Sequence, residues 1–86
     1  MEELPEKCEK LLASIARMAV EYQRYEIAVW CRDVKKELAY GVVFNEDLTI
    51  EEFLGKCANK MKNLGKKDQD LIAPMLREFK LNILNI

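Results

Sequence analysis

Hydrophobic residues recur every three or four positions over the first quarter of the chain. On a helical wheel they fall within about 60° on either side of Ile15, which defines one apolar face. The members of this series are Leu4, Cys8, Leu11, Leu12, Ile15, Met18, Ala19 and Tyr22. Glutamates come early in the segment and arginines late, an order that complements the helix dipole. The pattern predicts a helix over residues 5–23.

The next stretch of the chain changes from helical spacing to a period of two. From Leu38 to Phe44, large apolar side chains alternate with small or polar ones, as in a half-buried strand. The run that precedes it, over residues 25–31, is rich in side chains that favour strands. We therefore expect an antiparallel β-hairpin with strands at residues 26–32 and 37–44.

A helix is the alternative interpretation of the same stretch. Several apolar residues there also share one helical face, namely Ile27, Trp30, Val34 and Leu38. A helix over residues 26–39 would replace the hairpin and make the protein an all-α four-helix bundle.

The clearest local signal marks the start of a helix after residue 49. Thr49 and Glu52 have the spacing of a capping box, and Leu48 and Phe53 flank it as a hydrophobic staple. Apolar residues then continue along one face until a glycine that can end the helix. The pattern predicts a helix over residues 50–64.

The last quarter of the chain combines helical spacing with a proline. Pro74 lies within the helical pattern, so either the helix kinks there or a short turn precedes a helix that begins at Pro74. Residues 79–86 alternate and are compatible with a short C-terminal strand. We therefore expect one α+β domain over residues 1–86, in the order helix, hairpin, helix, helix.

Composition and charge narrow the class of protein. Half of the 86 residues are hydrophobic, yet no apolar run approaches the roughly 20 residues that span a bilayer, so we expect no membrane insertion. The N-terminus lacks the pattern of a secretory signal, which predicts a cytoplasmic protein. The net charge is −1, whereas a dedicated duplex-DNA binder usually carries a clear excess of basic residues. So small a net charge also causes little electrostatic repulsion between copies of the chain.

The sequence offers little material for catalysis. Histidine is absent and Ser14 is the single serine, so neither a Ser–His nor a Cys–His pair can be built. The glycines are too far apart to form a phosphate-binding loop. We therefore predict a protein that is not an enzyme and that binds no cofactor.

Three widely spaced cysteines, Cys8, Cys31 and Cys57, each fall on an apolar stripe. The interpretation that we favour is three buried thiols in a reducing compartment. The alternative is a zinc site completed by a carboxylate.

Two groups of residues are candidates for binding another protein. Aromatic and basic side chains alternate around Trp30, and such residues are enriched at interface hot spots. A row of small residues on the first helix would let a partner approach closely. The candidate interface comprises Ala13, Ala16, Val20, Trp30, Arg32 and Tyr40. The alternatives are that the aromatic residues form the core and that the alanines merely favour a helix.

A cluster of lysines is the candidate site for an anion or a nucleic acid. It comprises Lys56, Lys60, Lys62, Lys66 and Lys67, without an acidic residue between positions 53 and 67. The alternative is a solvated helix end whose cations complement the dipole.

These features together predict a non-catalytic protein–protein interaction module. We expect a small regulator or inhibitor that covers a partner's surface and that also self-associates, most simply as a homodimer. The alternative function is a nucleic-acid-associated protein that uses the lysine cluster and the aromatic residues around Trp30.

Overall fold

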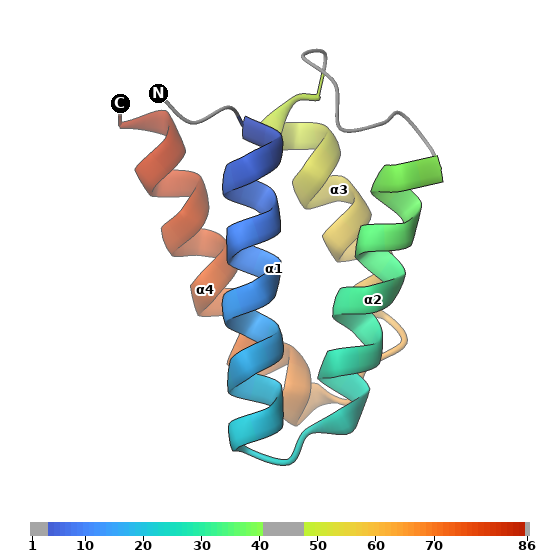
Figure 1. Cartoon of the computed structure of the whole chain (residues 1–86). Coiled ribbons are helices and arrows are strands. Elements are labelled where there is room, and N and C mark those ends of the chain that lie inside the picture. The colour runs from blue at the N-terminus through green and yellow to red at the C-terminus, as the bar shows by residue number, and fades with distance from the viewer. Residues whose placement is uncertain (1–3, 41–47, 86) are drawn as a thin grey trace.

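The computed structural model describes residues 4–40 and 48–85, apart from the side chains of residues 39 and 40, and within them the chain forms four helices and no strand. The helices are α1 (Leu4–Glu21), α2 (Tyr25–Tyr40), α3 (Ile50–Met61) and α4 (Lys66–Leu84). Consecutive helices run in opposite directions, so that α1 begins and α4 ends at the same end of the molecule (Figure 1).

The predicted hairpin, and with it the α+β class, is wrong. Helix α2 occupies residues 25–40, where we expected the first strand and half of the second; residues 41–44 lie outside the described residues. The buried side chains of α2 are Ile27, Trp30, Cys31, Val34 and Leu38, which are spaced by three, one, three and four. This spacing places them on one helical face, so burial of that face outweighs the strand propensity of the individual residues. The all-α alternative is the correct fold class.

The predicted C-terminal strand is also absent from the described residues, because α4 continues to Leu84. Pro74 lies inside this helix on an exposed face, and the helix extends on both sides of it. A proline removes one backbone hydrogen bond from the helix interior. Helix α4 buries Ile72 and packs Phe79 against Phe53 of α3, and burial of such apolar side chains opposes that loss.

A tight turn joins α1 to α2. The Arg24 N–H donates to the Ala19 carbonyl (2.7 Å) and the Gln23 N–H to the Val20 carbonyl (3.2 Å). These are the two hydrogen bonds of a Schellman motif, which closes the C-terminus of a helix. Gln23 has φ 57°, the left-handed conformation that the motif requires.

The core lies between the four helices, each of which packs on its neighbours in the chain, while α4 also packs on α1. Its buried side chains are Cys8, Leu12, Ile15, Ala19, Ile27, Trp30, Cys31, Val34, Leu38, Leu48, Phe53, Cys57, Leu64 and Ile72. The rings of Phe53 and Phe79 meet edge to face, with centroids 5.6 Å apart, and join α3 to α4.

The ends of α3 are closed by side chains. Its predicted start is confirmed, because the Thr49 hydroxyl accepts a hydrogen bond from the Glu52 N–H at 3.1 Å. Its predicted end lies three residues too late, since α3 stops at Met61. There the side-chain amide of Gln69, from α4, donates to the carbonyls of Met61 (3.1 Å) and Leu64 (2.8 Å). The connection between α3 and α4 is therefore held by hydrogen bonds to α4.

An ion pair fixes the start of α4 to the turn between α1 and α2. The Arg24 Nε lies 3.4 Å from Oδ1 of Asp68, a buried carboxylate in the first turn of α4. This contact is an ion pair without hydrogen-bond geometry, and no other described residue donates a hydrogen bond to Oδ1. The position of Asp68 near a helix N-terminus stabilises its negative charge.

Candidate functional site

The structure places Trp30, a residue of the candidate interface, in the core. Its side chain is 2 % exposed, and its indole N–H donates to the Cys57 carbonyl of α3 at 3.3 Å. Trp30 therefore serves to join α2 to α3, which is the alternative that the sequence left open for the aromatic residues. The side chain of Tyr40 lies outside the described residues.

Three other residues of the candidate interface come together on one surface. Ala13 and Ala16 of α1 and Arg32 of α2 line a groove between these two helices with a volume of about 280 Å³. We call it the α1–α2 groove. Val20 is 70 % exposed further along α1. The predicted stripe of small residues thus lies at the surface, beside a helix that the sequence analysis did not favour.

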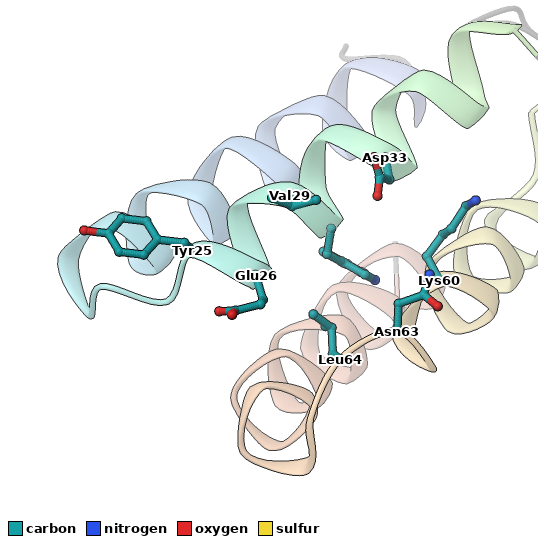
Figure 2. Close-up of a pocket in the computed structure, with 8 residues that line it drawn as sticks. Tyr25, Glu26, Val29, Asp33, Lys60, Asn63 and Leu64 are labelled. Carbon is teal, nitrogen blue, oxygen red and sulfur yellow. The ribbon is translucent and has the colours of Figure 1, made fainter.

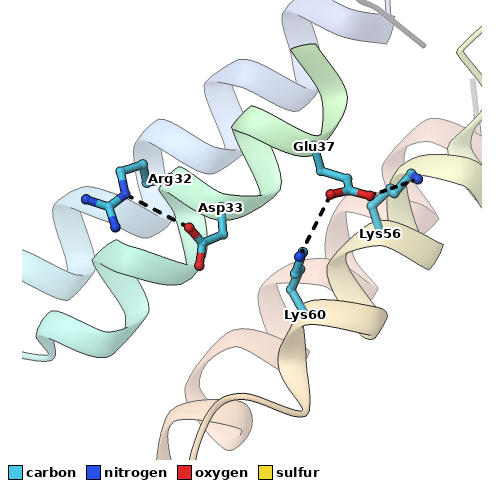
Figure 3. A network of polar contacts seen from close by, with 5 residues as sticks. All are labelled: Arg32, Asp33, Glu37, Lys56 and Lys60. Atoms are coloured by element: carbon cyan, nitrogen blue, oxygen red, sulfur yellow. Dashed lines mark hydrogen bonds and ion pairs between the residues drawn. The ribbon is translucent and has the colours of Figure 1, made fainter. Parts of the chain in front are cut away.

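The predicted lysine cluster is largely engaged with acidic residues of the same chain. Lys56 Nζ lies 3.3 Å from Glu37 Oε1, and Lys60 Nζ lies 3.8 Å from Glu37 Oε2, so both lysines of α3 point at α2 (Figure 3). Lys66 pairs with Asp70 at 3.6 Å. The remaining members, Lys62 and Lys67, are exposed. These ion pairs reduce the positive charge that the cluster offers to an anion.

A hollow between α2 and the C-terminal part of α3 is the candidate binding site. Its volume is about 230 Å³, and we call it the α2–α3 hollow (Figure 2). The lining residues are Tyr25, Glu26, Val29, Trp30, Asp33, Lys60, Asn63 and Leu64. Buried Trp30 and Leu64 contribute to an apolar lining, whereas Tyr25 and Val29 remain 71 % and 44 % exposed. Large apolar side chains thus remain at the surface beside a preformed recess.

The acidic residues of α2 that face α3 fall into two groups. Glu37 is matched by the two lysines of α3 described above. Among the residues that the structure describes, half-buried Asp33 forms an ion pair with Arg32 alone, at 4.0 Å (Figure 3), and Glu26 forms none. Glu26 and Asp33 both line the α2–α3 hollow, one towards each end (Figure 2). The hollow is therefore apolar inside and acidic at its ends along α2.

This hollow was not predicted from the sequence. Tyr25 and Val29 stand one helical turn apart on α2, so they share one surface of this helix. Glu26 and Asp33 fall on the same side of α2 for the same reason. The signal was present as a spacing of three and four, and the hairpin interpretation concealed it.

The three cysteines are buried thiols from three different helices. Burial raises the pKa of Cys8 and of Cys31 from 9.0 to about 12. Burial also raises the pKa of Cys57 to about 12, and the proximity of Cys8 and Cys31 adds to this effect. All three thiols therefore stay protonated near neutral pH and are poor nucleophiles. In residues 4–40 and 48–85, no cluster of three or more potential ligands could hold a metal ion.

Comparison of the chain with models of protein families, with curated proteins and with solved structures found no match. Among the helices that the structure describes, none is long and apolar enough to cross a membrane. The fold and the site define a class of molecule, namely a small four-helix domain with an acid-rimmed apolar hollow.

Proposed function

We propose that the protein is a non-catalytic protein–protein interaction module, a small regulator or inhibitor that covers a partner's surface. The observation that supports this function is the exposure of Tyr25 and Val29 beside the α2–α3 hollow. Single exposed apolar residues are ordinary on protein surfaces, but exposed apolar residues that adjoin a recess are typical of binding sites. The lining of the α1–α2 groove, in contrast, includes no large apolar side chain that is strongly exposed.

The energetics of burial favour this surface as the centre of an interface. Complete burial of a side chain such as valine contributes roughly 1.5–3 kcal/mol, and tyrosine is enriched at hot spots. A partner that covers Tyr25 and Val29 would therefore gain binding energy without unfolding any part of the domain.

Self-association and cellular location are further parts of the proposal. A near-neutral net charge and the exposed Val20 favour a homo-oligomer. Three unpaired cysteines favour a reducing compartment such as the cytoplasm. Binding to nucleic acid is less well supported, because Lys56, Lys60 and Lys66 already pair with carboxylates.

Site-specific photo-cross-linking in the source cells tests this function. A photoreactive amino acid replaces Val29 in the hollow, and the control protein carries the same group in place of Asn82, an exposed residue of α4. We expect a discrete protein adduct from position 29 that Tyr25→Ser abolishes, and no such adduct from position 82. Identical adducts from both positions, a nuclease-sensitive adduct, or insensitivity to Tyr25→Ser would contradict the proposal.

A further inference from the structure

The α2–α3 hollow has features that restrict the chemistry of its partner. Glu26 and Asp33 lie seven residues apart on α2, which corresponds to about 10.5 Å along a helix. Between these two carboxylates the lining includes apolar groups of Val29, Trp30 and Leu64. The order along the hollow is therefore acidic, apolar, acidic.

The ion pairs of the neighbouring turn explain why these two carboxylates remain available. Glu37 is the third acidic residue on this side of α2, and it receives both Lys56 and Lys60. Lys60 is the basic residue of the lining, and its ammonium group is turned towards Glu37 (Figure 3). Glu37 thus binds both lysines of α3 beside the hollow, and neither lysine forms an ion pair with the two carboxylates that line it.

We infer that the partner presents a basic amphipathic helix to the α2–α3 hollow, with one aliphatic side chain between two cationic residues seven positions apart. The aliphatic side chain enters the hollow, where a volume of about 230 Å³ suits a single side chain. The two cations reach Glu26 and Asp33, and a helix with a spacing of seven matches the rise between them. This inference rests on the proposed function and specifies the partner's chemistry.

A designed peptide provides the test. The probe is a capped, alanine-based helix of about 16 residues with arginine at positions i and i+7 and leucine at position i+3. Binding is measured by fluorescence anisotropy, and the site is reported by the indole N–H resonance of Trp30, the single tryptophan of the chain. We expect saturable binding with a dissociation constant below about 1 mM and a shift of that resonance.

Neutral variants of the protein test the role of the two carboxylates. Glu26→Gln combined with Asp33→Asn should weaken binding by about three- to tenfold, because each partly exposed ion pair contributes modestly. The matched control, Glu9→Gln with Glu78→Gln, removes the same charge from two exposed residues that do not line the hollow and should bind normally. Equal affinity for both double variants would overturn the inference.

Two altered peptides complete the experiment. Glutamate in place of both arginines should abolish binding, and alanine in place of leucine should reduce the shift of the Trp30 resonance. Binding of the acidic peptide would overturn the inference, as would a concentration-dependent shift of that resonance without peptide, which would place a second copy of the chain in the hollow. A cross-linked partner at position 29 without peptide binding would leave the proposed function standing and refute only the inference.

Discussion

Gln23 holds a backbone conformation that glycine usually provides. Its φ of 57° closes α1 through the Schellman motif, and a side chain in this region costs about 1–2 kcal/mol. We expect Gln23→Gly to raise the free energy of unfolding by about 1 kcal/mol, because glycine removes the steric cost of positive φ. The greater conformational freedom of glycine in the unfolded chain offsets part of this gain. Chemical denaturation would measure this gain.

Gln23→Ala is the control for this prediction, since alanine meets the same steric conflict as glutamine at positive φ. Its free energy of unfolding should stay close to that of the wild type. Equal stability of the glycine and alanine variants would show that the left-handed conformation is not the source of the effect.

The three buried thiols make stability depend on alkaline pH. Their pKa values are about 12 in the folded protein against 9.0 ordinarily. Below pH 9 the thiols are protonated in both states, whereas above it the unfolded chain releases protons that the folded protein retains. The free energy of unfolding should therefore fall as pH rises from about 9, by up to about 1.4 kcal/mol per pH unit for each thiol.

Urea titrations at several pH values between about 8 and 10 would measure this slope. Cys57→Ala lowers stability at every pH because it leaves a cavity, but it should also reduce the slope by about one third. An unchanged slope in this variant would mean that Cys57 ionises with its ordinary pKa in the folded state.

The N-terminus of α3 depends on one hydroxyl group. The Thr49 side chain accepts the Glu52 N–H, which would otherwise lack a partner in the helix. Thr49→Ala should cost about 1 kcal/mol and lower the melting temperature by roughly 4–8 °C, as measured by circular dichroism. Thr49→Ser keeps the acceptor and should melt near the wild type. Equal melting of the alanine and serine variants would contradict the capping role.

The contrast between α3 and α2 shows what this sequence could predict. The start of α3 is marked by the cap between Thr49 and Glu52, which are close in sequence, and such local chemistry is visible without the fold. Helix α2 contains residues that favour strands one by one, and its helical face becomes decisive only when α1 and α3 bury it. Tertiary packing therefore determines that α2 is a helix, which the local sequence did not reveal.

The candidate site was predictable only in part, for the same reason. The exposure of Val20 and of the small residues on α1 followed from the first helical wheel. Trp30 was singled out for its type, yet its indole fills the space between α2 and α3. Tyr25 and Val29, the large apolar residues of α2 that stay exposed, can be identified only when the packing of that helix is known.

At the scale of the whole molecule, self-association is expected to use α1. Ala13 and Ala16 permit close approach along the α1–α2 groove, and Val20 would be covered at its end. Light scattering at micromolar concentration should give a mass above the monomer value of 10.1 kDa. Val20→Glu should restore the monomer, whereas Val29→Glu, in the separate hollow, should leave the mass unchanged. A wild-type mass of 10.1 kDa throughout would reject the oligomer.

The up-and-down order of the helices also has a consequence for the rate of folding. Each helix packs mainly on its neighbour in the chain, and α1 and α2 make the most extensive pair. Proteins with such local contacts fold within microseconds to milliseconds, because little loop entropy is lost before contacts form. We expect the α1–α2 pair to form first in the transition state, so substitutions at Gln23 should change the rate of folding and leave the rate of unfolding nearly unchanged.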